Sequence, residues 1–170
     1  MTVDFDMWLN QVAPLDEFDP GARPAGAEKL LREIFDRRGP ISVQELRAES
    51  RSLQMDIAQD AVALVLRDVH ATTKARPNVE IRHDDEYGLI VSYDGNWTTP
   101  AMMAMKNPEA TCEIADYLQG GIVEDSAVWT AWPICPTHRN GLYAQVHDDA
   151  AVWYCRTGTH SVAVIGQLMP

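Results

Sequence analysis

Two pairs of metal-ligand residues near the C-terminal end constrain the fold of this chain more than any other feature. The first pair is Cys135 and His138, and the second is Cys155 and His160. A tetrahedral zinc site needs four nitrogen or sulfur donors that converge on one point, and a short spacing lets one tight turn direct two side chains there. The intervening chain must therefore fold back on itself if one ion is to take all four ligands.

The residues between the two pairs predict a β-hairpin. Residues 142–146 partly alternate between apolar and polar, residues 147–149 (His-Asp-Asp) are typical of a turn, and residues 151–154 favour a strand. A further strand is expected over residues 161–165. Such a hairpin would place the second pair beside the first.

Segment 133–168 resembles a zinc ribbon, whose knuckles carry Cys-Pro-x-Cys-Gly on hairpin turns. The departures are that His138 stands where the second cysteine is expected, the glycine is displaced to Gly141, and the second pair has the wider spacing. The resemblance implies one structural zinc ion held by both pairs. Four protein ligands would leave no open position for water, which argues against catalysis by the metal. The alternative is a metal-free module with two buried reduced cysteines and two surface histidines.

Composition limits the class of protein. The 170 residues suit one domain or two small ones, and no stretch is apolar for long enough to span a bilayer. The acidic N-terminus lacks the cationic start of a signal peptide, and three cysteines do not make a disulfide framework. We therefore expect a cytoplasmic protein, or a virion or phage protein made in the cytoplasm. The net charge of −11 opposes binding to nucleic acid and to anionic membranes, and favours solubility or a basic protein partner.

Residues 1–26 are rich in proline, glycine and acidic residues, which predicts an extended arm. The arm also contains Phe5, Trp8 and Leu9, which are too apolar for a plain tail. These residues either pack on the body of the protein or bind a protein partner, and Trp8, Phe5 and Leu9 are the candidate partner-binding residues.

Residues 27–93 predict three helices followed by a hairpin. The first helix covers 27–38, a capping box at Ser42 and Glu45 opens a short helix to about residue 49, and a third helix spans about 55–71. A buried strand is the alternative for the short apolar run at residues 61–66. The hairpin covers residues 79–93.

This order of elements resembles a winged helix, and segment 38–46 is similar to the passage between the first two helices of that family. The resemblance implies either DNA binding or a scaffold for protein docking. The expected recognition helix carries Asp56, Asp60 and Asp68, and the expected wing tip is acidic at residues 84–86. Because a DNA-binding surface is basic, protein docking is the favoured use.

Residues 96–132 connect this body to the C-terminal module. The connection contains Met102, Met103 and Met105, and a helix is predicted over residues 107–119, ended or interrupted by the glycine pair at 120–121. Trp129 and Trp132 either join this helix to the ribbon or form an exposed docking patch.

Catalytic motifs are missing from the sequence: it has no nucleophile elbow, P-loop, dinucleotide fingerprint or zincin motif. Cys112 lies in the predicted 107–119 helix and is either a small buried residue or a nucleophile paired with a histidine. Nothing near Cys112 in the sequence supports the second interpretation.

We therefore predict an α+β protein with an arm (1–26), a winged-helix-like domain (27–95), a connecting segment with a helix (96–132) and a zinc-ribbon-like module (133–170). As a whole it resembles uncharacterised actinobacterial or phage proteins. The expected function is a non-catalytic, protein-binding adaptor or regulator with structural zinc, of a phage or toxin–immunity system. The alternatives are a winged-helix transcription regulator that binds DNA and an enzyme with a site near Cys112.

Overall fold

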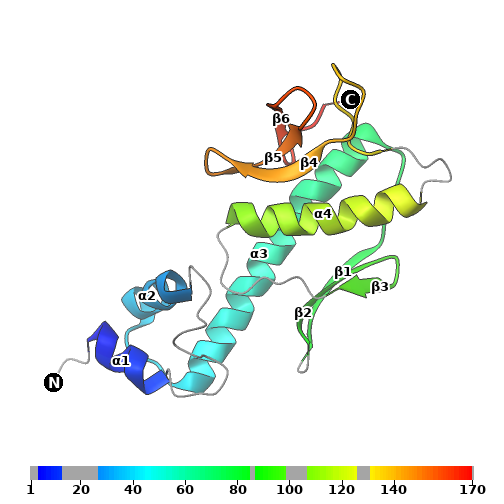
Figure 1. Ribbon diagram of the computed structural model, residues 1–170. Coiled ribbons are helices and arrows are strands. Elements are labelled where there is room, and N and C mark those ends of the chain that lie inside the picture. Colours follow the sequence, from blue (N-terminus) through cyan, green and yellow to red (C-terminus); the bar gives the residue numbers. More distant parts are fainter. Residues whose placement is uncertain (1–3, 13–26, 85–86, 99–106, 126–130, 170) are drawn as a thin grey trace. The chain divides into compact units, whose positions relative to one another are not determined.

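A computed structural model describes residues 4–12, 27–84, 87–98, 107–125 and 131–169 (Figure 1). These residues form four helices and two antiparallel three-stranded sheets, which confirms the α+β class. The helices are α1 (Phe5–Val12), α2 (Ala27–Arg38), α3 (Val43–Thr72) and α4 (Asn107–Asp125). The strands are β1 (Val79–Asp84), β2 (Gly88–Tyr93), β3 (Asn96–Thr98), β4 (Tyr143–His147), β5 (Ala150–Cys155) and β6 (His160–Val164).

The described residues divide into two compact units within α3. The first unit contains the described residues up to Gln54, and the second unit contains those from Met55 onward. The domain boundaries expected from the sequence, after residues 26, 95 and 132, stay predictions. None of the helices in the described ranges is long and apolar enough to cross a lipid bilayer.

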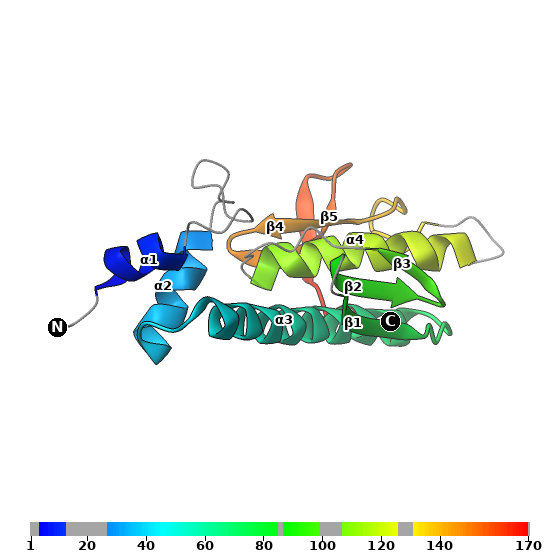
Figure 2. The ribbon, with the colours of Figure 1, turned by 90° about the horizontal axis from the view of Figure 1, so that it is seen from below.

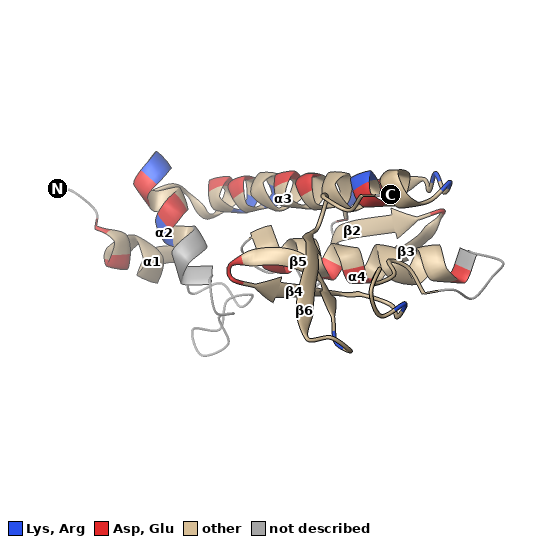
Figure 3. Ribbon diagram, turned by 90° about the horizontal axis from the view of Figure 1, so that it is seen from above, with Lys and Arg blue, Asp and Glu red and all other residues tan. Residues whose placement is uncertain are grey.

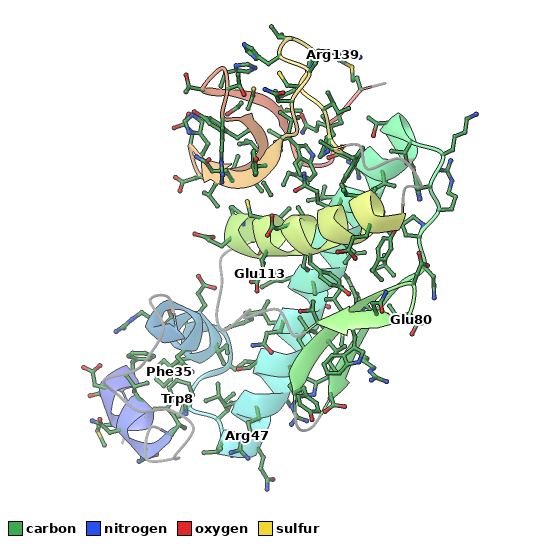
Figure 4. The ribbon with its side chains drawn as sticks, turned by 45° about the vertical axis from the view of Figure 1, so that its right-hand side comes forward. Trp8, Phe35, Arg47, Glu80, Glu113 and Arg139 are labelled. Atoms are coloured by element: carbon green, nitrogen blue, oxygen red, sulfur yellow. The ribbon has the colours of Figure 1, made fainter. Side chains whose placement is uncertain are left out.

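The first unit is built on an aromatic core from the N-terminal residues. Trp8 is 1% exposed, and its ring lies 5.2 Å from that of Phe35 (Figure 4). The indole N–H of Trp8 donates a hydrogen bond to the carbonyl oxygen of Ile41 at 2.8 Å. The buried members of this core are Phe5, Trp8, Val12, Leu31, Ile34 and Leu46.

The predicted extended arm is therefore wrong for residues 5–12, which are helical because their apolar side chains fall on one face. Residues 13–26 lie outside the described part. Of the candidate partner-binding residues, Phe5 and Trp8 are buried and Leu9 packs against the same core. Packing on the body is the alternative that the structure shows, and a partner could reach Phe5 or Trp8 only if this core opened.

Helix α3 is continuous, whereas the sequence predicted a short helix to residue 49 and a separate helix from 55. That prediction is wrong because residues 50–54 contain neither glycine nor proline and nothing interrupts the backbone ladder. The helix order expected for a winged helix is not seen in the described residues. The predicted capping box is confirmed: the backbone N–H of Ser42 donates to Glu45 Oε2 at 2.9 Å, and the N–H of Glu45 donates to Ser42 Oγ at 3.3 Å.

In the second unit, α4 lies between the two sheets (Figures 1 and 2). It contacts β4 and β5 on one side and Tyr93 of β2 on the other. Its buried residues, which include Ala110, Ile114 and Leu118, recur every three to four positions and therefore fall on one broad face of the helix. The glycine pair at 120–121 does not end or interrupt this helix. A Cβ at Gly121 would lie 2.7 Å from Tyr93 Cδ1, so glycine here permits a close approach of helix and sheet.

Both predicted hairpins are confirmed. In β1–β2 the register pairs Val79 with Tyr93, and the chain then turns at Asp94-Gly95 into β3, a strand that the sequence did not predict. In β4–β5 the register pairs His147 with Ala150 across a two-residue turn. The turn residues Asp148 and Asp149 have φ values of 50° and 58°, which aspartate tolerates better than most residues.

A buried carboxylate attaches the C-terminal sheet to α3. Asp68 is 0% exposed, unlike the acidic residues on the outer face of this helix (Figure 3). It accepts hydrogen bonds from the indole N–H of Trp153 at 2.6 Å, and from the backbone N–H groups of Gly166 at 2.7 Å and Leu168 at 2.8 Å. Trp132 adds a second attachment, because its ring lies 5.4 Å from that of Trp153 and its N–H donates to Thr72 Oγ1. Trp132 is thus part of a core, as one interpretation of the sequence had it, while Trp129 lies outside the described residues.

Candidate metal centre

A tight turn before β4 presents Cys135 and His138. The backbone N–H of Cys135 donates a hydrogen bond to the carbonyl oxygen of Asn140 at 2.8 Å. The backbone N–H of Arg139 donates a hydrogen bond to the carbonyl oxygen of Cys135 at 2.9 Å. Arg139 takes a φ of 59°, and a bridge between Ile134 and Gly141 closes the turn. Figure 4 shows Arg139 at the tip of this turn.

The second pair lies where β5 passes into β6. Cys155 is the last residue of β5, His160 is the first residue of β6, and the two are paired in register. The backbone N–H of Gly158 donates a hydrogen bond to Cys155 Sγ at 3.4 Å. The wider spacing of this pair is therefore accommodated by the turn that joins two neighbouring strands.

The structure brings all four predicted ligands together. Their donor atoms lie within 4.8 Å of one another, and both cysteines are buried. The nitrogen His138 Nδ1 is 3.5 Å from Cys135 Sγ and 3.4 Å from Cys155 Sγ, and His160 Nε2 is 3.8 Å from Cys135 Sγ. These side chains are close enough to bind one metal ion. The three distances just given are also close to the separations between donor atoms that a shared tetrahedral ion requires.

The surroundings of Cys135 favour its thiolate form. Burial alone would raise the pKa of this thiol, but hydrogen bonds from the backbone N–H and the side chain of His138 outweigh burial. Weaker hydrogen bonds from Thr137 and Cys155 act in the same direction and bring the pKa of Cys135 to about 6. Since the thiolate is the metal-binding form of cysteine, the fold prepares this ligand before any ion arrives.

The histidines are also oriented for a metal. His160 Nδ1 lies 3.2 Å from the carbonyl oxygen of Gly158, so that Nδ1–H donates there and leaves Nε2 free as a ligand. A Cβ at Gly158 would lie 2.2 Å from His138 Cε1 and 2.6 Å from His160 Nδ1. Any larger residue would therefore push the two imidazole rings apart. A hydrogen bond from Asn140 Nδ2 to Thr157 Oγ1, at 2.9 Å, ties the two ligand turns together.

Cys112 takes no part in this cluster. Burial, together with the neighbouring carboxylate of Glu109, raises the pKa of the Cys112 thiol to about 11. A thiol of this kind is a poor nucleophile at neutral pH, because little of it is ionised. The interpretation of Cys112 as a half-buried structural residue fits the geometry better than a catalytic one.

Sequence reasoning missed two groups that support the site. Asp68 was placed on a DNA-facing surface, whereas it is buried and holds the strand that ends in Cys155. One signal was available: Asp68 is an acidic residue next to Val69 on the apolar face of its helix. No local signal indicated the contact between Asn140 and Thr157, because it joins two separate turns. The methionine-rich connection at residues 102–105 lies outside the described residues.

Comparisons of this chain with known protein families, with curated proteins and with solved structures each give no match. The zinc-ribbon and winged-helix resemblances therefore gain no support from relatives.

Proposed function

We propose that the C-terminal module binds one structural zinc ion through Cys135, His138, Cys155 and His160. The observation that carries this proposal is the convergence of two thiol sulfurs and two imidazole nitrogens within 4.8 Å. A set of two sulfur and two nitrogen donors in a tetrahedral arrangement favours zinc over magnesium or calcium, which prefer oxygen.

The proposed ion serves stability and not catalysis. All four coordination positions would be taken by side chains, so that no position is left for water or substrate. The ion would link the turn before β4 to the β5–β6 turn, which are otherwise joined by the Asn140–Thr157 hydrogen bond. Because such a site does not exist in the unfolded chain, the free energy of metal binding adds to the free energy of folding.

The test is elemental analysis of protein purified without chelators, with about one zinc expected per chain. Cobalt substitution should then give the visible absorption of a tetrahedral site with thiolate ligands. Cys155→Ser should lose the metal, and Cys112→Ser is the matched control because Cys112 lies outside the cluster. Equal metal content in both variants would contradict the proposal.

For the whole protein we propose a non-catalytic role in binding another protein, as an adaptor or regulator. The charge distribution supports a protein partner over DNA, because α3 exposes Asp56 and Asp60 and carries acidic side chains along its length (Figure 3). A DNA-binding helix would be expected to carry the opposite charge. Binding to a defined DNA sequence at nanomolar concentration and physiological salt would overturn this assignment and favour the transcription-regulator alternative.

A further inference from the structure

Two large aromatic side chains lie exposed side by side on the sheet β1-β2-β3. Trp97 is 56% exposed and Tyr87 is 51% exposed, although the interior of the same unit buries comparable rings such as Trp153. The two ring centroids are 5.7 Å apart and the ring planes are tilted by 50°. Exposed aromatic residues that gather in one place are a feature of binding surfaces.

Trp97 of this pair lines a hollow on the outer face of this sheet, here called the trough, and Tyr87 flanks Trp97 without lining the trough itself. The register places Glu80 opposite Ser92 and Arg82 opposite Ile90, with Trp97 opposite Ser92 on the other side. Residues of the central strand β2 thus form the floor, Glu80 and Arg82 of β1 form one wall, and Trp97 of β3 forms the other. The hollow measures about 140 Å³. Figure 4 shows Glu80 on the side of the sheet away from α4.

The polar groups of the trough are mainly donors. Among the described residues, none accepts a hydrogen bond from the indole N–H of Trp97 or pairs with the guanidinium of Arg82. Ser92 adds a hydroxyl to the floor, and Glu80 is bonded to Asn78 Nδ2 at 3.2 Å. A complementary ligand therefore has compact apolar groups for the aromatic rings and carbonyl oxygens for the neighbouring donors.

We infer that this trough binds an extended, proline-containing peptide segment of a partner protein. A polyproline II segment has no internal hydrogen bonds, so its carbonyl groups are free to accept from Trp97, Arg82 and Ser92. Its pyrrolidine rings pack on tilted aromatic pairs, and its stiffness lowers the entropic cost of binding. Nucleic acid fits less well because Glu80 lies beside the single cation Arg82 in a chain of net charge −11.

This inference rests on the protein-binding role proposed above and does not depend on the metal. The experiment is a titration of the full chain with a ten-residue proline peptide, followed by tryptophan fluorescence and by NMR of the indole N–H groups. We expect saturable binding that shifts the Trp97 indole signal. Trp97→Ala should weaken binding at least tenfold, and Trp97→Phe should recover most of it because the ring face is kept. Tyr143→Ala is the matched control, since Tyr143 is 42% exposed on the other sheet.

Each outcome decides the assignment. Equal binding by the wild type and Trp97→Ala would mean that the peptide binds elsewhere. That result would overturn the assignment of the peptide to the trough but would leave the protein-binding role intact. No saturable binding of the proline peptide up to millimolar concentration would also overturn it. Trp97-dependent binding of cellohexaose or of a ten-nucleotide oligo(dT), in place of the peptide, would assign the trough to a saccharide or to single-stranded DNA and refute the peptide assignment. Proline binding that persists after zinc is removed by a chelator would support the inference, whatever the fate of the zinc proposal.

Discussion

Replacement of Asp68 should destabilise the second unit more than any other change of a single acidic side chain in the described residues. Three donors meet this buried carboxylate: the indole N–H of Trp153 and the backbone N–H of Gly166 at Oδ2, and the N–H of Leu168 at Oδ1. Asp68→Ala leaves all three without a partner. A buried donor that loses its acceptor costs about 1–3 kcal/mol, but the N–H of Leu168 is only part-buried and can reach water.

We therefore expect Asp68→Ala to lower the free energy of unfolding by about 3–5 kcal/mol, a large part of the total stability of a typical domain. Asp68→Asn keeps one oxygen for Trp153 and Gly166 but turns its amide group toward the N–H of Leu168. Its expected cost is about 1–3 kcal/mol because one donor of the three is lost. Asp60→Ala is the matched control, since Asp60 is exposed on the same helix, and it should change stability by less than about 0.5 kcal/mol.

The assay is urea unfolding of the metal-loaded protein, followed by near-ultraviolet circular dichroism, with metal content measured on the same samples. The expected order of destabilisation is Asp68→Ala, then Asp68→Asn, then Asp60→Ala. A cost below about 1 kcal/mol for Asp68→Ala would refute the argument, because it would mean that the three hydrogen bonds contribute little beyond what water supplies.

Three further predictions follow from other elements. Gly120→Ala should stabilise α4 by about 0.5–1 kcal/mol, because no atom lies within contact distance of a Cβ at this position. Gly121→Ala should instead cost about 1–3 kcal/mol, because its Cβ would overpack against Tyr93. Thermal unfolding that ranks the two variants in the reverse order would contradict the close contact. Ser42→Ala should cost about 1 kcal/mol through loss of the cap. Because the side chain and backbone of Ser42 hold the pKa of Glu45 below its ordinary value of 4.5, the stability from this carboxylate is complete above pH 4.5 and is lost as pH falls through the lowered pKa, and Ser42→Ala should flatten that part of the pH profile. The thiol of Cys135 has its pKa lowered from 9.0 to about 6, so in metal-free protein its contribution to stability is complete above pH 9 and declines as pH falls toward 6. Urea unfolding of chelator-treated protein should show this decline, whereas Cys135→Ser should flatten it; equal pH profiles of the two proteins would contradict the lowered pKa.

Local patterns in the sequence were sufficient for much of the fold and for the whole ligand set. The capping box at Ser42 and the hairpin turn at Asp148-Asp149 are each fixed by residues only a few positions apart. The two ligand pairs were recognisable for the same reason: each pair lies on one turn, and the hairpin between them left little choice about where the second pair would fall.

The failures involve contacts between residues far apart in the chain. Gly121 was expected to end or interrupt a helix on its local propensity, but the ring of Tyr93 makes a small residue necessary there while the helix continues. Asp68 was taken for a surface acid because its three partners are contributed by residues 153–168. The apolar N-terminal residues were divided between core and partner surface, and only the packing of Trp8 on Phe35 distinguishes the two.

The long separation between Asp68 and its partners has a consequence for synthesis of the chain. Among the described residues, the core of the first unit is made by residues 5–46, which are synthesised before most of the protein. The hydrogen bonds that Asp68 accepts from Gly166 and Leu168 cannot form until these residues, 98 and 100 positions later, have been synthesised. On a ribosome the two units would therefore mature at different times. During the interval α3 would present an apolar face with an unsatisfied acid, which makes it the segment where chaperone binding to the nascent chain should concentrate.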